Sequence, residues 1–316
     1  MRYVLRADAS QSIGSGHVMR SSAVAEELIA RGKIVIFAGQ ISNVPWLAQR
    51  INTLGFSQIL SSPESFISNP YTDVLILDSY IVPVRDVFIQ TEKWKSVVVL
   101  ADEFTPAYEA AIVIYPGLSS KWISTLNAKI LAGPKFIPFR KSIQKVEKAS
   151  LNKVILEILV IGGGTDSFNF TGAVCEVLRD TPGNFHASIF ANNTSLSEFD
   201  SRLSVVPIGS DLDELAKSAG LVFTTASVTS LEFIAREVAV GIGCATDNQE
   251  EYYGSLSTFG VAVPIGRFVA GNWELDQAQI TELIYSIDLR DALRSKCANL
   301  IDLDGASRIA DEILKL

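Results

Sequence analysis

The chain has 316 residues, of which 48% are hydrophobic and 20% charged, so it is long enough for two domains and apolar enough to bury a core in each. Its formal net charge of −8 disfavours nucleic acid or an anionic membrane as the main partner, because the average surface would repel both. Arg2, Arg6 and Asp8 interrupt the apolar residues of the N-terminus, which argues against a signal peptide, and no apolar stretch approaches the ~20 residues that span a bilayer, so we expect a cytoplasmic protein.

The first half alternates short apolar, β-branched runs with amphipathic stretches. A helix is expected over about 17–31, with Val18, Ala25 and Leu28 on its apolar stripe and Gly32 placed to end it. The expected strands are 3–6, 34–38, 73–77, 97–100 and 112–115. Continuous apolar strands separated by helices predict a parallel sheet that is covered on both faces.

Residues 139–153 are rich in lysine and arginine and lack a strong apolar stripe, which is typical of a linker. The alternation of strand and helix then starts again, and the tail from Trp273 is expected to be mostly helical. We therefore expect one α/β domain over 1–142 and a second over 143–316, whose C-terminal helices can pack back on the first. Two such halves would bind a ligand between them, at the carboxyl ends of their strands.

Each half opens with a strand that runs into glycines, IGSGH at 13–17 and IGGGTD at 161–166. Glycines in this place let the backbone approach a phosphate, and the following helix directs its positive end there. Neither loop is a dinucleotide fingerprint, because Met19 stands where the third glycine belongs, and neither contains the GK[ST] of a P-loop. We expect no cofactor. A tight turn without a ligand is the alternative for 162–164.

The chain has only two histidines. His17 is expected at the start of the first helix, where the helix dipole disfavours the charged imidazolium, so that a neutral ring can act as a general base. A hydrogen bond from a helix-terminal histidine to a loop is the structural alternative. His186 lies in a strand-like segment and is expected to be structural.

In the second half, TTASVTSLEF at 224–233 places small polar residues between a strand and a helix. Thr229 or Ser230 could cap this helix and leave its N–H groups to bind an anion, with Glu232 as a ligand contact or only a favourable acid near the helix start. Asn248 and Gln249 follow another strand and could hydrogen-bond a hydroxyl-rich ligand, with a helix-capping turn as the alternative.

Acidic residues also end two strands of the first half. Asp78 and the pair at 102–103 could line the ligand site or merely form turns. No metal-ligand spacing is visible in the chain. The three cysteines, which have no paired spacing, are expected to be buried apolar residues: Cys175, Cys244 and Cys297.

Taken in order, these motifs resemble the PseG family of UDP-sugar hydrolases, which act in pseudaminic acid biosynthesis. The similarity begins at RADASQSIGSGHVMR and recurs at LILDSY (75–80), LAGPKF (131–136), IGGGTDSF (161–168), the helix of Glu232, DNQ (247–249) and DGASRI (304–309). The wider relatives of that family are inverting glycosyltransferases of the MurG kind. The resemblance implies a GT-B fold of two Rossmann-like domains.

The resemblance also implies an activity and a set of site residues. The enzyme would use water to release UDP from an acetamido-substituted deoxysugar, without a metal, as a monomer or weak homodimer. The catalytic histidine of the family matches His17. The nucleotide contacts would be Gly163, Gly164, Thr165, Thr229, Ser230 and Glu232. The sugar-side contacts would be Arg6, Asp8, Gly14, Gly16, Arg20, Asp78, Tyr80, Asn248 and Gln249.

The chain departs from the family pattern beside both pockets. Residues 225–232 replace a glycine pair and a Trp-Glu step, 237–239 replace a Gly-x-Pro, Ser21 and Ser22 replace a Cys-Leu, and Ala101 stands where a second Asp is common. These changes leave the identity of the sugar open. A glycosyltransferase and a non-catalytic nucleotide-sugar binding protein are the alternatives. A transferase with a membrane-bound acceptor would need an exposed apolar patch, for which 45–56 is the weak candidate.

Overall fold

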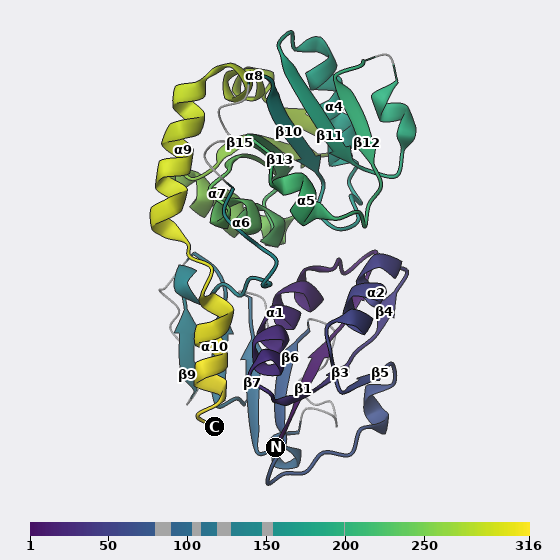
Figure 1. Cartoon of the computed structure of the whole chain (residues 1–316), viewed down its shortest axis with the longest axis vertical. Helices are drawn as coiled ribbons and strands as arrows, with labels where there is room; N and C mark the ends of the chain where they lie inside the picture. The colour runs from purple at the N-terminus through teal and green to yellow at the C-terminus, as the bar shows by residue number, and fades with distance from the viewer. Residues whose placement is uncertain (80–89, 103–108, 119–127, 147–153, 199) are drawn as a thin grey trace. The chain divides into compact units, whose positions relative to one another are not determined.

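The computed structural model describes residues 1–316 except 80–89, 103–108, 119–127, 147–153 and 199. The described chain divides into two compact units. Unit 1 is Met1–Lys141 together with Leu303–Leu316, and unit 2 is Ser142–Asp302. Each unit is an α/β body built on one large sheet (Figure 1).

The sheet of unit 1 is parallel throughout, and among the described residues it has seven strands in the order β5-β3-β1-β6-β7-β8-β9. Those strands are β1 (Arg2–Ala7), β3 (Ile34–Ala38), β5 (Gln58–Leu60), β6 (Val74–Asp78), β7 (Ser96–Leu100), β8 (Ile112–Tyr115) and β9 (Lys129–Ala132). Two short strands pair beside it, β2 (Ala9–Ser10) and β4 (Ile41–Ser42). The helices of the unit are α1 (Gly16–Ala30), α2 (Pro45–Thr53) and α10 (Gly305–Ile313), with 3-10 turns at Pro63–Ser65, Thr91–Lys93 and Pro134–Phe136.

Unit 2 repeats this topology, in the order β12-β11-β10-β13-β14-β15-β16 among the described residues, with only β16 antiparallel to its neighbour. Its strands are β10 (Leu156–Ile161), β11 (Phe185–Phe190), β12 (Leu203–Val206), β13 (Leu221–Thr225), β14 (Ala239–Cys244), β15 (Val263–Val269) and β16 (Asn272–Leu275). Its helices are α4 (Phe170–Asp180), α5 (Leu212–Ala216), α6 (Val228–Ala235), α7 (Glu250–Phe259), α8 (Gln277–Tyr285) and α9 (Ile287–Leu300), with 3-10 turns at Thr194–Ser197 and Asp247–Gln249.

Counted within its own unit, each sheet therefore has the strand order 3-2-1-4-5-6-7. This is the doubly wound order, in which the chain reverses direction across the sheet between the first and fourth strands. The reversal lies between β1 and β6 in unit 1 and between β10 and β13 in unit 2. Ligands of such sheets bind outside the carboxyl ends of the strands at this switch point.

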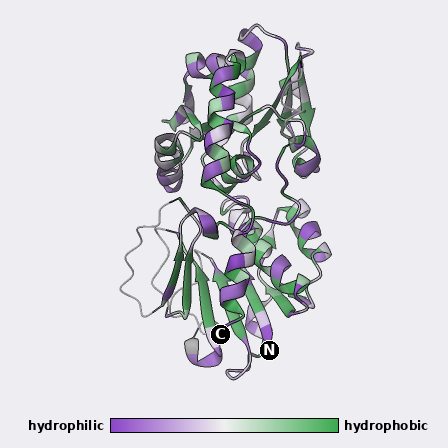
Figure 2. Cartoon of the chain, turned by 60° about the vertical axis from the view of Figure 1, so that its left-hand side comes forward, coloured by the Kyte–Doolittle hydropathy of each residue, from purple (hydrophilic) through white to green (hydrophobic). Residues whose placement is uncertain are grey.

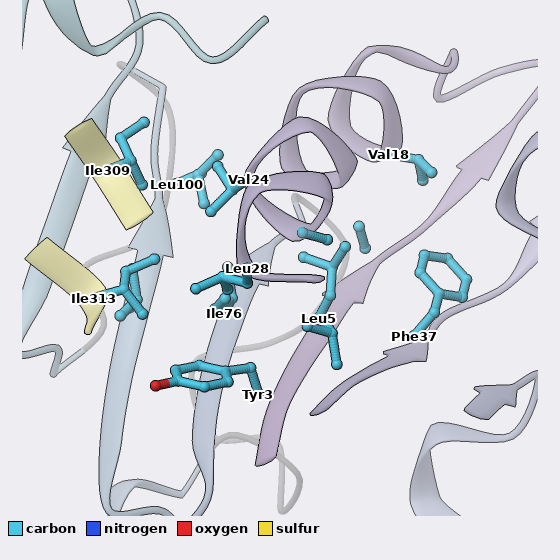
Figure 3. Close-up of a cluster of buried hydrophobic side chains, with 14 of the residues drawn as sticks. Tyr3, Leu5, Val18, Val24, Leu28, Phe37, Ile76, Leu100, Ile309 and Ile313 are labelled. Carbon is cyan, nitrogen blue, oxygen red and sulfur yellow. The ribbon is translucent and has the colours of Figure 1, made fainter. Parts of the chain in front are cut away.

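The core of unit 1 explains why α1 and α10 lie where they do. Val18, Val24 and Leu28 of α1 face β1 and β6, and Ile309 and Ile313 of α10 join the same cluster (Figure 3). A second cluster, which includes Val4, Leu75 and Trp94, packs on the opposite face of the sheet. The strands are correspondingly hydrophobic, whereas the helices alternate apolar and polar residues (Figure 2). Burial on both faces confirms the prediction from the continuous apolar strands.

Several sequence predictions are confirmed at this level, and one needs correction. The first helix ends as expected, because Gly32 follows its last turn with φ +73°. The tail from Trp273 is mostly helical, as expected, although Trp273 itself belongs to β16 and the first helix of the tail begins at Gln277. The boundary between the units, after Lys141, falls inside the expected linker 139–153, of which 147–153 lies outside the described residues. In α2 the apolar residues Leu47 and Ile51 are buried, so this helix does not expose the apolar patch considered for 45–56.

Candidate active site

His17 lies at the switch point of unit 1, because the loop after β1 turns directly into α1. Gly14 has φ +83°, a left-handed conformation that L side chains rarely adopt, and its N–H donates to the Ser10 carbonyl at 2.8 Å. This turn starts α1 at Gly16 and makes His17 the second residue of the helix. The ring is 7% exposed.

Asp78 holds the imidazole from the neighbouring strand. It is the last residue of β6, in register with Ala7 of β1, and it is fully buried. Its Oδ1 lies 2.6 Å from Nδ1 of His17. An ionised carboxylate can only accept hydrogen bonds, so Nδ1 is the donor, and in the neutral ring Nε2 then carries the lone pair. This His17–Asp78 pair is the central feature of the site.

Arg20 lies one helical turn beyond His17 and binds the same carboxylate. Its Nε donates to Oδ2 of Asp78 at 2.8 Å and its Nη2 to Oδ1 at 2.7 Å, while its Nη1 donates to Oδ1 of Asp102 at 2.7 Å. Burial alone would lower the pKa of the guanidinium, but the carboxylates of Asp102 and Asp78 raise it well above the ordinary arginine value. Arg20 is thus a permanent cation beside His17.

Sequence reasoning assigned Arg20 and Asp78 to the sugar, whereas the structure brings both onto His17 and onto each other. It named Asp102, with Asp78, as able to line the ligand site, but it did not predict their shared contact with Arg20. The available signal was that Asp78 ends β6 and Asp102 comes just after β7, and these two strands pair in the sheet. Carboxyl ends of adjacent parallel strands meet at one edge, so two acids there can share a cation.

Arg6 and Asp8 form a second buried pair at the end of β1. The Asp8 carboxylate also accepts from the Gln40 N–H at 2.8 Å and from the Ser79 hydroxyl at 3.4 Å. Ser79 follows Asp78 directly, so the two polar clusters lie side by side along the sheet edge. Tyr80, the remaining sugar-side residue predicted in this unit, lies outside the described residues.

In unit 2 the glycine loop follows β10, and two of its glycines have separate structural reasons. Gly163 has φ +85°, which requires glycine for the backbone alone. At Gly162 a Cβ would lie 1.8 Å from Oδ1 of Asp166. That carboxylate accepts hydrogen bonds from the N–H groups of Phe170 at 2.9 Å and Thr171 at 3.4 Å. The start of α4 is therefore capped by the protein's own acid.

The cap has an electrostatic consequence for the loop. Burial raises the pKa of Asp166, and the hydrogen bonds from Thr171 and Phe170 offset part of that rise. A phosphate at the same N–H groups would have to displace this carboxylate. Thr165, predicted as a nucleotide contact, shares a hydrogen bond of 2.9 Å with the Ser167 hydroxyl.

At the switch point of unit 2, α6 follows β13 and has the second helix N-terminus that could bind a phosphate. Its N-cap is Ser227, not Thr229 or Ser230 as the sequence suggested, and the Ser230 hydroxyl accepts from the Ser227 N–H at 3.2 Å. Glu232 is buried on the fifth position of the helix. A Cβ on Gly163 would lie 4.0 Å from Oγ1 of Thr225, so the loops after β10 and β13 meet at one edge of the sheet.

Asn248 and Gln249 lie in the 3-10 turn that leads into α7, at the carboxyl end of β14. Oε1 of Gln249 accepts from the Ala245 N–H at 2.8 Å, and Oδ1 of Asn248 accepts from the Thr246 hydroxyl. Both side chains therefore order their own turn, which was the structural alternative for this segment, and both remain at the edge where a ligand would bind.

The second histidine and the three cysteines lie in the sheet or the core of unit 2. Nδ1 of His186 in β11 lies 3.1 Å from Oε2 of Glu157 in the adjacent β10. All three cysteines are buried, as predicted, and burial raises the pKa of the thiols of Cys175 and Cys297 to about 12 and of Cys244 to about 11. Among the described residues no three His, Cys, Asp or Glu side chains gather as a metal ion would require, and no helix could cross a membrane.

Comparison with known proteins settles the fold. No protein-family profile matches the chain. The chain is similar along its whole length to the crystal structure of MurG from Acinetobacter baumannii, with a TM-score of 0.69, 13% identity and all of both chains covered. The chain has a GT-B fold. The spinosyn rhamnosyltransferase SpnG, solved with thymidine diphosphate, has the same fold with a TM-score of 0.64 and 11% identity over 98% of this chain and 100% of that one.

Two further similar proteins limit what can be inferred about the reaction from the GT-B fold alone. A putative UDP-N-acetylglucosamine 2-epimerase from Listeria monocytogenes matches with a TM-score of 0.59 and 12% identity over 99% of this chain and 95% of that one. The uncharacterized protein MJ1062 of Methanocaldococcus jannaschii is 26% identical over 80% of this chain, which spans 57% of the length of that protein. The fold is therefore shared by enzymes of different reaction types, and the reaction must be argued from the site.

Proposed function

We propose that the protein hydrolyses a UDP-activated, acetamido-substituted deoxysugar of the kind used in pseudaminic acid-type surface polysaccharides, with His17 as the general base. The observation that carries this proposal is the buried His17–Asp78 pair at the switch point of unit 1. Support also comes from the GT-B fold, whose solved examples include a transferase bound to thymidine diphosphate and a putative UDP-N-acetylglucosamine 2-epimerase.

The proposed step is a displacement at the anomeric carbon. Water attacks this carbon while Nε2 of His17 takes a proton from it, and Asp78 stabilises the imidazolium that forms through the hydrogen bond to Nδ1. The bond between the anomeric carbon and the phosphate oxygen breaks, and its electron pair leaves with UDP. The products are the free sugar and UDP, and the proton on His17 passes to solvent.

The nucleotide is assigned to unit 2. We place its diphosphate at the N-terminus of α6 and not at that of α4, because Asp166 already accepts the N–H groups of α4. Gly163, Gly164, Thr165, Thr229 and Ser230 would surround it, and Glu232 would accept hydrogen bonds from the ribose. Arg6, Asp8, Asn248 and Gln249 are the proposed contacts of the sugar.

A glycosyltransferase is the second candidate, and the solved structures of this fold favour it, since they include the calicheamicin glycosyltransferase CalG4 and the spinosyn rhamnosyltransferase SpnG. The same base would then take its proton from an acceptor hydroxyl. Hydrolysis is preferred here because of the order of motifs from RADAS to DGASRI along both halves.

One incubation separates the candidates. The protein is mixed with a panel of UDP-linked acetamido-deoxysugars, with and without EDTA, and UDP and free sugar are quantified by mass spectrometry. A hydrolase releases both in equal amounts without an acceptor, and we expect EDTA to leave the rate unchanged because helix N–H groups can stabilise the diphosphate. Turnover that starts only after an acceptor is added assigns a transferase, and binding without turnover contradicts both.

His17→Asn tests the role of the base in the same assay. We expect turnover to fall by about 10²–10⁴-fold, the usual scale of general-base catalysis, with UDP affinity unchanged. His186→Asn is the matched control, because its ring pairs with Glu157 in the sheet of unit 2 and should leave turnover at the wild-type level. A His17→Asn variant that hydrolyses at near wild-type rate excludes the histidine as the base.

A further inference from the structure

We propose that Arg20 and Asp102 are positioning residues that act through Asp78 to fix the protonation of the His17 ring, so that Nδ1 holds the proton and Nε2 stays basic. The catalytic consequence of this arrangement rests on the function proposed above. The arrangement itself concerns only the ring and its neighbours, and it can be tested without turnover.

The geometry joins three elements through one guanidinium. Arg20 of α1 donates from Nε and Nη2 to the two oxygens of Asp78 at the end of β6, and from Nη1 to Asp102 just after β7. Such a two-pronged contact fixes the plane of the Asp78 carboxylate, because both oxygens are held at once. The orientation of Oδ1 toward Nδ1 of His17 then follows from Arg20 and not from the imidazole.

Charge decides what that orientation does to the ring. Asp78 is fully buried and would pull a second proton onto His17 if its charge were not compensated. Arg20 compensates it, and Nη2 lies 3.3 Å from Nδ1, where a guanidinium opposes a positive ring. Asp102, whose side chain is 21% exposed, draws part of the Arg20 charge away. The two acids therefore compete for one cation beside the histidine.

The charge of the Arg6–Asp8 pair at this edge of the sheet does not alter the expected direction of the change in His17 protonation. From β1 the described groups are Arg6 and Asp8, which neutralise each other in their own pair. From α1, β6 and β7 the charged groups that pair with the ring or with its partners include Arg20, Asp78 and Asp102. The ring should respond to loss of Arg20 and to loss of Asp102 in opposite directions.

The chain has two histidines, so an NMR experiment on imidazole nitrogens observes only two rings. Imidazole nitrogens of the full-length ¹⁵N-labelled protein are followed by NMR from pH 5 to pH 9, and His186→Asn assigns the two rings. In the wild type we expect the neutral His17 ring to be protonated on Nδ1. In Arg20→Met the ring should gain its second proton at a higher pH than in the wild type, and in Asp102→Asn at a lower pH.

Arg20→Lys is the matched control, because an ammonium keeps the charge but cannot grip both oxygens in a fork. Its ring should gain the second proton at a pH between those of Arg20→Met and the wild type. If Arg20→Met does not fold, Asp102→Asn decides alone, since amide for carboxylate keeps the shape of a partly exposed side chain. Unchanged ring spectra in Asp102→Asn, or a shift of both variants in the same direction, overturn the proposal. Absence of hydrolysis in the wild type would sink the proposed function and leave these spectra as an independent result.

Discussion

The position of one proton on the His17 ring decides what the site can do. The proposed base needs an unprotonated ring nitrogen, and the hydrogen bond that Asp78 accepts from Nδ1 leaves Nε2 of the neutral ring unprotonated. Asp78 depends on two features of its surroundings. Burial keeps water from its oxygens, and the positive charge of Arg20 offsets the cost of burying its negative charge. The three residues therefore work as a unit, and removal of any one should affect the chemistry more than the fold of the sheet.

Asp78→Asn tests this unit at its centre. The Arg20 guanidinium can only donate, so it would bind the oxygen of the substituted amide and turn the amide NH₂ toward His17. The ring would then accept at Nδ1 and carry its proton on Nε2, the wrong tautomer for a base. We expect turnover to fall by about 10²–10⁴-fold at saturating UDP-sugar, measured as UDP release. Asp73→Asn, just before the start of β6, is the control. It is expected to lower stability but to keep the turnover of the folded protein, because Asp73 pairs with Arg2 and not with His17. Equal losses in both folded variants would point to a general defect of the strand.

Among the elements, the two glycine loops share one backbone feature. Gly14 and Gly163 both occupy left-handed backbone conformations between a strand and the switch-point edge. Neither would place a Cβ in a collision, since nothing lies within 4 Å of that position at Gly14 and only Oγ1 of Thr225 lies at 4.0 Å at Gly163. Their requirement for glycine is therefore a property of the backbone.

Gly163→Ala isolates that requirement. A Cβ at φ +85° costs about 1–3 kcal/mol, so we expect a loss of stability of this size in urea unfolding. Gly254→Ala is the matched control: Gly254 lies inside α7, nothing surrounds its Cβ position within 4 Å, and its φ is not positive. That variant should be neutral or more stable, since alanine favours a helix by about 1 kcal/mol. Equal stability of the two variants would contradict the backbone argument.

The ion pair between Arg2 and Asp73 joins β1 to β6 and predicts a pH dependence of stability. Burial alone would raise the pKa of Asp73, but hydrogen bonds from Arg2, the Asn69 N–H and the Thr72 hydroxyl lower it below its ordinary value. A carboxyl whose pKa is lowered by folding stabilises the protein above its unfolded pKa of about 4 and loses that effect as the pH falls through the folded value. Asp73→Asn should therefore cost about 1.5–3 kcal/mol at pH 7. Thermal unfolding at pH 7 and at pH 3 checks this, and a difference from the wild type that grows toward pH 3 would reverse the assigned sign.

The sequence predicted elements well where apolar runs were long. The strands at 34–38 and 112–115 have the expected bounds, and the others of that set differ by one or two residues. It did not predict β5, β9 or β16, which are three or four residues long and carry no clear alternation. The strand β16 exists because Trp273 pairs with Phe268 across a hairpin, and such pairing depends on a partner and not on the segment itself.

The site was predictable only in part, for a similar reason. His17 could be singled out because it follows a glycine turn at the start of a helix. Its partner Asp78 lies 61 residues away, and their contact depends on β6 pairing with β1 across the switch point. The apolar pattern of a single strand does not show which other strand it will pair with in the sheet. Arg20 could therefore be placed on the right helix face but not on its two carboxylates.

In the whole molecule the same strand order occurs twice, and each unit has its own hydrophobic core. The polar groups at the two switch points differ in kind. Unit 1 presents a histidine on a buried acid, which shares an arginine with a second acid, and unit 2 presents helix N–H groups, small hydroxyl side chains and the buried Glu232. This division suits a base in one unit and a nucleotide diphosphate in the other.

The division predicts that catalysis and nucleotide binding respond independently to substitution. Glu232→Gln should weaken UDP binding by about ten-fold or more, because a charged acceptor of ribose hydroxyls contributes roughly 1.5–3 kcal/mol. His17→Asn should leave that affinity unchanged and lower turnover. His17 and Glu232 belong to different units, and independent substitutions usually add within about 0.5 kcal/mol, so the double variant should bind UDP as Glu232→Gln does and lose kcat/KM by the product of the two single losses. UDP affinity from calorimetry and initial rates are measured on the wild type, the two single variants and the double variant, which together form a double-mutant cycle. A double variant that binds UDP more weakly than Glu232→Gln would mean that His17 contacts the nucleotide, and the base would then have to be sought elsewhere.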